Sequence, residues 1–274
     1  MNPSIGIDIL ETLPNVQNVA EASRFVVAVP SGVKSIRSIG LEMSGTTFDS
    51  SHVDTLEVLA NGKPLQQYRE AAHLEVIQAY YGANVASGRL LVDFERSHLT
   101  QAIDREKFLM GLADISTFQL QGNIAGSTAP ELAAYEQKTV VRRADDNAST
   151  AKKRNELGVF TKVKNFTHTL TGAGTTEIDN LPREAWLQAL HLIQSADVIT
   201  NVEVWADGRK VWDASKARME MVVEDAGRTK QADTYHIDWM LANELGGQFP
   251  LAGVQDFRLK IDHSGGATLT VYAE

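Results

Sequence analysis

Two aspartates and one histidine have a spacing that could support chemistry. Asp93 ends the stretch Leu91-Val92-Asp93, and Asp238 ends the similar stretch His236-Ile237-Asp238. If both stretches are strands, His236 and Asp238 share one face, where they could act in acid–base catalysis or bind a metal. The two aspartates could also supply oxygen ligands to a cation such as calcium. Leucine replaces the histidine in the first stretch, which favours a structural hydrogen-bonding role for both aspartates over catalysis.

Motifs of known enzymes are missing from the sequence, which contains no G-x-S-x-G, H-E-x-x-H or P-loop pattern. The run Gly172-Ala173-Gly174-Thr175-Thr176 lacks the Gly-Lys-Ser/Thr ending of a phosphate-binding loop and is interpreted as a flexible turn. No two histidines have the spacing of a metal-binding pair, and the seven are scattered at His52, His73, His98, His168, His191, His236 and His263. The sequence therefore predicts a protein that is not an enzyme, with no catalytic or cofactor-binding residues. It leaves metal ligands unknown.

The composition narrows the class of protein. The chain has 274 residues, of which 43% are hydrophobic and 22% charged, as in folded globular proteins. A formal net charge of −9 argues against direct nucleic-acid binding, which requires a basic surface. The absence of cysteine excludes disulfides and thiolate chemistry. No apolar stretch approaches the length of about 18 residues typical of a membrane-spanning helix.

Short alternating segments between turn residues indicate a β-rich fold that must position these side chains. Phe25–Val29 is apolar and ends at a Pro-Ser-Gly turn, and Phe257–Ile261 alternates strictly between apolar and charged residues. Leu269–Tyr272 is a further predicted strand. This pattern is typical of a β-sandwich or barrel. The first residues, including Ile5, Ile7, Ile9 and Leu10, could form an interior arm.

One strand-turn-strand stretch occurs twice. Residues 56–65 read LEVLANGKPL and residues 202–211 read VEVWADGRKV, with four of ten positions identical. Asn61-Gly62 and Asp207-Gly208 both readily take the positive φ angles of a type I′ turn. Apolar residues then recur at helical spacing from Leu65 to Tyr80, and less regularly from Val211 to Val222. A hairpin and a turn leading into a helix are therefore both open.

Further matches extend this repeat in a constant order. Their separation falls from 152 to 139 positions along the chain, as loops of different length would cause; the matched pairs are Pro30/Pro182, Glu57/Glu203, Glu75/Glu220, Asp93/Asp238 and Phe118/Phe257. The sequence thus predicts two related β-sandwiches, residues 1–130 and 166–274, joined by a polar connection over residues 131–165. Leu59 and Trp205 point away from their strands' main apolar face. We expect a loop, the other sandwich or another subunit to cover them.

Several long segments resemble the major capsid proteins of corticoviruses, tailless bacteriophages with an internal membrane. The strongest resemblance lies in residues 174–183, 233–241 and 255–262, and similar but less exact segments occur at residues 13–16 and 44–68. It spans nearly the whole chain and implies an all-β double jelly roll with short flanking helices. It also implies trimers that act as pseudo-hexameric capsomers and tile an icosahedral shell over a lipid membrane.

The resemblance carries further expectations about partners and place. The expected partners are other copies of the chain, minor capsid and vertex proteins, and the underlying viral membrane or its proteins, without direct nucleic-acid binding. The expected location is the virion capsid, assembled in the bacterial host cytoplasm. Calcium is associated with the corticovirus coat, although no ligands can be matched here. The alternatives are a tandem carbohydrate-binding or adhesive sandwich, and a polysaccharide-cleaving enzyme using Asp93 and Asp238.

Overall fold

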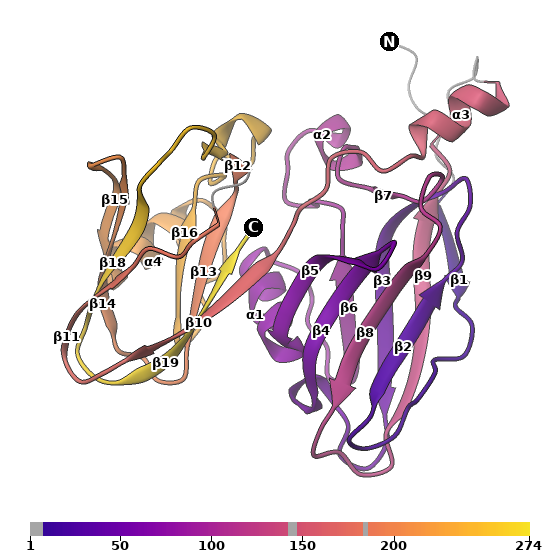
Figure 1. The fold of residues 1–274 in the computed structure, drawn as a ribbon, viewed down its shortest axis with the longest axis horizontal. Helices are drawn as coiled ribbons and strands as arrows, with labels where there is room; N and C mark the ends of the chain where they lie inside the picture. The colour runs from indigo at the N-terminus through magenta and orange to yellow at the C-terminus, as the bar shows by residue number, and fades with distance from the viewer. Residues whose placement is uncertain (1–7, 142–146, 183–185) are drawn as a thin grey trace. The chain divides into compact units, whose positions relative to one another are not determined.

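The computed structural model describes residues 8–141, 147–182 and 186–274 (Figure 1). The chain divides into two compact units. The first unit comprises Met1–Glu75 and Asn84–Lys162, and the second comprises Val76–Ala83 and Val163–Glu274. Within the described residues, no helix has the length and apolar character needed to cross a membrane.

The first unit is a sandwich of two antiparallel sheets. One sheet, here called the β9 sheet, has the strand order β1 (Asp8–Thr12), β9 (Glu131–Thr139), β3 (Ser35–Ser44) and β6 (Arg89–Asp93), with β7 (Met110–Gly111) also paired to β3. The other has the order β2 (Arg24–Val29), β8 (Phe118–Ile124), β4 (Val53–Ala60) and β5 (Lys63–Glu70). Figure 1 shows the two layers face to face.

The second unit repeats this topology strand for strand. Its β19 sheet has the order β10 (Lys164–Leu170), β19 (Ala267–Ala273), β13 (Ala189–Gln194) and β16 (Thr234–Asp238). Its other sheet has the order β11 (Gly174–Ile178), β18 (Phe257–His263), β14 (Ile199–Ala206) and β15 (Arg209–Ser215). A short pair, β12 (Trp186–Leu187) and β17 (Phe249–Pro250), stands apart. Two four-strand layers of this order in each unit form a jelly roll, so the chain is a double jelly roll.

The core of each unit lies between its two sheets. In β8 every second residue is buried, beginning with Phe118 and Leu120, as a strand with one face on the core requires. In the second unit, Leu190 and Leu192 of β13 join Val202 and Val204 of β14 in one apolar cluster. The face of the β9 or β19 sheet that is turned away from this core is called its outer face below.

Helices occupy corresponding places in the two units. α1 (Ala71–Tyr80) follows β5, and α4 (Lys216–Asp225) follows β15. Two residues after each helix comes a glycine of positive φ, Gly82 or Gly227, which lets the chain reverse without steric strain. The remaining helical segments are α2 (Ala102–Glu106), α3 (Ala148–Arg154) and the 3₁₀ turns η1 (Ser50–His52) and η2 (Leu245–Gly247).

The repeated stretch forms a β-hairpin in both units. Both central turn residues have positive φ, 49° and 74° at Asn61-Gly62 and 47° and 75° at Asp207-Gly208, as a type I′ turn requires. The helix predicted from Leu65 was wrong at its start, because residues 65–70 form β5 and α1 begins at Ala71. Tyr68 pairs with Leu56 across the hairpin, so strand pairing prevails over the helical spacing of the apolar residues.

The unit boundary also differs from the predicted limits. Residues 131–139, assigned from sequence to a polar connection, form β9 at the centre of the first unit's sheet. The sequence of this strand, ELAAYEQKT, looks polar because few of its residues are large and apolar. α3 belongs to the first unit as well, and residues 142–146 of the predicted connection lie outside the described residues. Ile9 and Leu10 of the predicted arm pair with β9, whereas Ile5 and Ile7 lie outside the described residues.

Candidate functional site

The two residues singled out in the second unit, His236 and Asp238, lie together on the outer face of the β19 sheet. The strand register places His236 directly opposite His191 of β13, and their Nδ1 atoms are 2.8 Å apart. The Tyr80 ring stacks on the His236 ring with centroids 3.9 Å apart. The Tyr80 hydroxyl donates a hydrogen bond of 3.0 Å to Oδ2 of Asp238. The side chains share one face as predicted, and Tyr80 bridges them.

Asp238 is held by a buried ion pair. Arg228 Nε donates to Asp238 Oδ2 at 3.1 Å, and both side chains are almost fully buried. The backbone N–H of Met240 donates to Asp238 Oδ1 at 2.7 Å. The Arg228 guanidinium also lies over the ring of Tyr81, 5.1 Å from its centroid. Such a pair restrains a structure strongly, since losing either partner leaves an uncompensated buried charge.

The histidine pair is neutral at one ring at least. Burial lowers the pKa of His236 well below its usual range, and the adjacent His191 lowers it further. A hydrogen bond between two Nδ1 atoms needs one donor and one acceptor, which a neutral ring supplies. At the far side, His191 Nε2 is 3.4 Å from Glu274 Oε2, which also accepts a hydrogen bond of 2.9 Å from the Tyr81 hydroxyl.

The two aspartates have the hydrogen-bonding role predicted for them. Asp93 Oδ1 accepts from the backbone N–H of Glu95 at 3.1 Å, two residues ahead, as Asp238 does from Met240. Burial raises the pKa of Asp93 to about 7, and the positive charge of Arg96 opposes part of this shift. In both units this hydrogen bond between the aspartate and the backbone stabilises the turn that follows the strand.

Neither aspartate offers a good calcium site. Both oxygens of Asp238 are engaged by donors, one of them the cationic Arg228, and Asp93 lies near Arg96. A hard cation requires several free oxygen ligands and no competing positive charge. Among residues 8–141, 147–182 and 186–274, no group of three or more metal-ligating side chains is assembled. The residues present therefore do not fit calcium at these two positions.

Sequence reasoning missed His191 as the partner of His236. The repeat aligns Leu190-His191-Leu192 with Ile39-Gly40-Leu41, and the strand register places Gly40 opposite Leu91 just as His191 lies opposite His236. The sequence signal that could have found this pair is that both histidines, His191 and His236, stand where the first unit has Gly40 and Leu91. Another histidine, His263, ties the predicted glycine turn, with Nδ1 2.8 Å from the carbonyl oxygen of Gly172.

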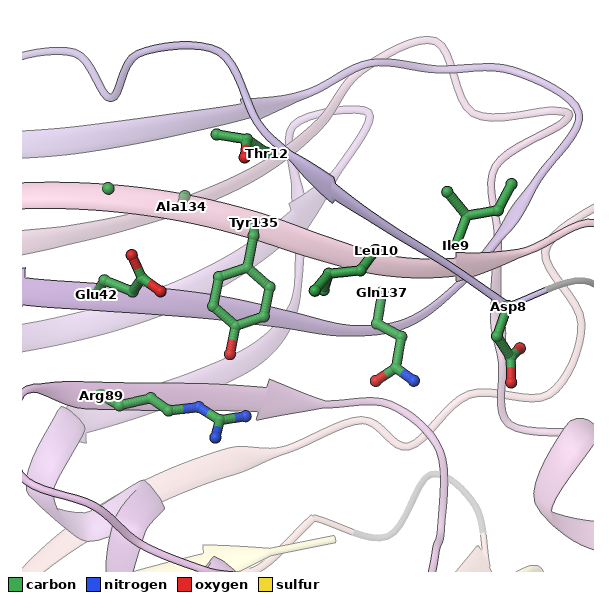
Figure 2. Close-up of a pocket in the computed structure, with 10 residues that line it drawn as sticks. Asp8, Ile9, Leu10, Thr12, Glu42, Arg89, Ala134, Tyr135 and Gln137 are labelled. Carbon is green, nitrogen blue, oxygen red and sulfur yellow. The ribbon is translucent and has the colours of Figure 1, made fainter.

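The corresponding outer face in the first unit is open. Gly40 is flanked by Leu91 of β6 and Tyr135 of β9, as His191 is flanked by His236 and Tyr272. A cavity of about 710 Å³ lies over this face (Figure 2) and is lined by Asp8, Ile9, Leu10, Thr12, Glu42, Arg89, Ala133, Ala134, Tyr135 and Gln137. Where the second unit buries its three central side chains completely, the first leaves Leu91 and Tyr135 half-buried.

Tyr135 forms the floor of this cavity. A Cβ atom at Gly40 would lie 2.1 Å from the Tyr135 ring, so the absence of a side chain there allows the ring to lie across β3. Figure 2 shows the ring directed toward Arg89 of β6, whose guanidinium carbon is 6.0 Å from the ring centroid. Leu10 of β1 is 72% exposed. The face combines apolar surface, an aromatic ring and one exposed cation.

Comparison with protein families matches both units. The family model described as Viral coat protein P2 N-terminal domain matches residues 10–139. The model described as Viral coat protein P2 C-terminal domain matches residues 160–274. Among individual proteins, the chain is 28% identical over 258 residues to major capsid protein P2 of Pseudoalteromonas phage PM2, which covers 91% of this chain and 90% of that protein.

Solved structures show the same fold. The crystal structure of major capsid protein P2 from bacteriophage PM2 matches with a TM-score of 0.83 at 24% identity, covering 97% of this chain and 96% of the other. The PBCV-1 virus capsid matches with a TM-score of 0.70 at 10% identity, covering 100% of this chain and 93% of the other. The two units thus share the architecture of double jelly-roll capsid proteins.

Proposed function

Because this chain belongs to the viral coat protein P2 family and is a structural capsid protein of the virion, we propose that three copies form one capsomer. The relatives are capsid proteins and not enzymes. The observation that carries the proposal is the repetition of one jelly-roll topology twice in a single chain. Three such chains present six similar units, which can fill a position of sixfold outline in a shell.

The wider assembly follows the same proposal. Capsomers tile an icosahedral shell over a lipid membrane. The further partners are minor capsid and vertex proteins and the membrane or its proteins. Assembly takes place in the bacterial host cytoplasm. The net charge of −9 supports a shell that does not bind nucleic acid directly. Leu59 and Trp205 are each half-buried in the single chain, and we expect another subunit to cover them on assembly.

Size-exclusion chromatography with mass detection, followed by electron microscopy, tests the trimer. We expect a species of three times the 30.0 kDa chain mass and particles of roughly sixfold outline. A protein that stays monomeric over the whole accessible concentration range would overturn the proposal. Flotation with phospholipid vesicles tests the membrane contact separately, and an assembled shell that never co-floats would remove the membrane from it.

A further inference from the structure

The helices α1 and α4 correspond residue for residue but are buried to different extents. Both have ten residues, and each is closed by three matching backbone hydrogen bonds around Gly82 or Gly227. Position by position, Ile77 corresponds to Val222 and Tyr80 to Asp225. Ile77 is 2% exposed and Tyr80 is fully buried, whereas Val222 is 36% exposed and the neighbouring Met221 is 57% exposed. α4 therefore carries an apolar surface that lacks the cover α1 has.

The cover of α1 is the outer face of the β19 sheet. Residues 76–83, which include the second half of α1, group with the second unit, whereas residues up to Glu75 group with the first. Tyr80 stacks on His236, and its carbonyl accepts a hydrogen bond from the N–H of Thr229. The helix that follows the first unit's hairpin thus ends on the second unit's outer face.

A second pair of matching surfaces is exposed among the described residues. The second unit's helix, α4, has exposed apolar residues, and the first unit's outer face, over the β9 sheet, has an open cavity. These are the counterparts of the two surfaces that α1 and the β19 sheet bury against each other. We propose that α4 of a second copy of this chain docks on the outer face of the first unit. This inference rests on the trimer proposed above.

The replaced residues are complementary in charge. Asp225 stands where α1 has Tyr80, and on the receiving sheet Arg89 stands where the second unit has Thr234. Both Asp225 and Arg89 are exposed. A carboxylate at the end of α4 and a guanidinium beside Tyr135 can pair across the contact. Met221 and Val222 supply apolar area that Leu10 and Leu91 can cover. The contact of α1 with the β19 sheet is thus aromatic, whereas the corresponding contact of α4 between chains is ionic and apolar.

Such a contact is of the type that builds rings. The donor surface on α4 and the acceptor surface over β3 are different patches, so the contact is heterologous. A heterologous contact joins copies head to tail and forms a ring when the rotation closes. With two jelly rolls per chain, three copies joined in this way contribute six jelly rolls to one ring. The trimer therefore needs this one interface and no self-complementary patch.

A charge exchange tests the contact. We measure the trimer dissociation constant by sedimentation equilibrium for the wild type, Arg89→Glu, Asp225→Arg and the double variant. Each single variant should weaken association by about tenfold or more, and the double variant should recover most of the loss. Val159→Asp is the matched control for Met221→Asp, because Val159 is 56% exposed and lies on neither surface. Met221→Asp should weaken the trimer and Val159→Asp should not.

Cysteine cross-linking gives a second readout that does not depend on affinity. The chain has no cysteine, so introduced thiols can react only with each other. Chains carrying Leu10→Cys, mixed with tagged chains carrying Met221→Cys and oxidised, should yield covalent heterodimers. Replacing Leu10→Cys by Val159→Cys should abolish them.

The outcomes separate this inference from the proposed function. A wild-type protein that never trimerises overturns both. Trimers that withstand Arg89→Glu, Asp225→Arg and Met221→Asp, and that give no Leu10–Met221 cross-link, overturn the α4 contact and leave the trimer standing. All the substituted side chains are exposed, so the variants should fold, and far-ultraviolet circular dichroism of each variant checks this.

Discussion

The outer faces of the two jelly rolls carry Gly40, Leu91 and Tyr135 in the first unit and His191, His236 and Tyr272 in the second. The strand register around the two sets is the same, yet their surroundings differ. The first set is open to a cavity. The second set is fully buried beneath Tyr80. The Nδ1 atoms of its two histidines face each other, His191 Nε2 is 3.4 Å from Glu274 Oε2, and Tyr80 donates to the neighbouring Asp238.

This difference shows how a duplicated fold can divide two tasks. Buried polar groups are costly without hydrogen bonds, so the bonds made by the two histidines, Tyr80 and Asp238 commit the second unit's face to one arrangement, although His236 Nε2 has no partner within the described residues. The first unit's face instead keeps apolar surface exposed at Ile9 and Leu10. Exposed apolar patches of this kind mark interaction sites. One face fixes the chain's own structure and the other is available to a partner.

The largest expected contrast comes from the two matching aspartates. Asp238→Ala leaves the buried Arg228 without its counter-ion and should cost about 3–5 kcal/mol of unfolding free energy. Asp93→Ala removes a carboxylate that burial disfavours in its charged form, and should change stability by less than about 1 kcal/mol at pH 8. Urea unfolding measures both.

Tryptophan fluorescence makes that measurement specific to one unit. All four tryptophans, Trp186, Trp205, Trp212 and Trp239, lie in the second unit, whereas circular dichroism reports on both. Asp238→Ala should therefore shift the fluorescence transition strongly. Equal losses from Asp93→Ala and Asp238→Ala would contradict the distinction drawn between the two faces.

The response to pH should have opposite signs at the two faces. The pKa of His236 is lowered in the fold, so its contribution is present above its unfolded value of about 6.5 and is lost as pH falls below it. The pKa of Asp93 is raised to about 7, so its contribution is present below about 4 and is lost as pH rises toward 7. The effect of Asp93 should amount to about 1–2 kcal/mol after allowance for solvent near its carboxyl group.

Variants separate these two contributions. Asp93→Asn should remove the loss of stability between pH 4 and 7 that circular dichroism records. His236→Leu, which copies the residue at Leu91, should flatten the fluorescence-detected loss below pH 6.5; His191 and Glu274 face the same site and stay unchanged in this variant. A fluorescence midpoint that rises as the wild type is acidified from pH 6.5 would contradict the sign given for His236.

Much of the fold was predictable because its repeated parts are local. The turns at Asn61-Gly62 and Asp207-Gly208 are specified by two adjacent residues each, and their neighbours preserve the match between the halves. The extent of α1 and the strand β9 were not predictable in this way. Tyr68 belongs to a strand because of its partner Leu56, and β9 is a strand because β1 and β3 flank it.

The candidate site was predictable only in part, for the same reason. His236 and Asp238 share a face through the period of a single strand, which the sequence shows. His191 and Arg228 meet them through strand pairing and loop packing, and Tyr80 comes from the end of α1, whose second half groups with the second unit. Contacts of that kind depend on distant segments, and one sequence without its fold contains no spacing that specifies them.

The smallest expected effect tests what the two units retain in common. Asn61 Oδ1 accepts the N–H groups of Ser116 and Thr117 before β8, and Asp207 Oδ1 accepts those of Gln255 and Asp256 before β18, so the two turns are bonded to corresponding loops of their units. Both hairpins also shift register two pairs before the turn, at Val58/Leu59 and Val204/Trp205.

Gly62→Ala and Gly208→Ala should therefore destabilise their units equally. Their φ angles of 74° and 75° are in the left-handed region, where a Cβ atom costs about 1 kcal/mol, and no heavy atom lies within 4 Å of the added methyl group in either turn. Urea unfolding by circular dichroism measures both variants, and fluorescence should follow Gly208→Ala alone. Losses that differ by more than about 0.5 kcal/mol would mean that the units have diverged in their hairpins as well as on their outer faces.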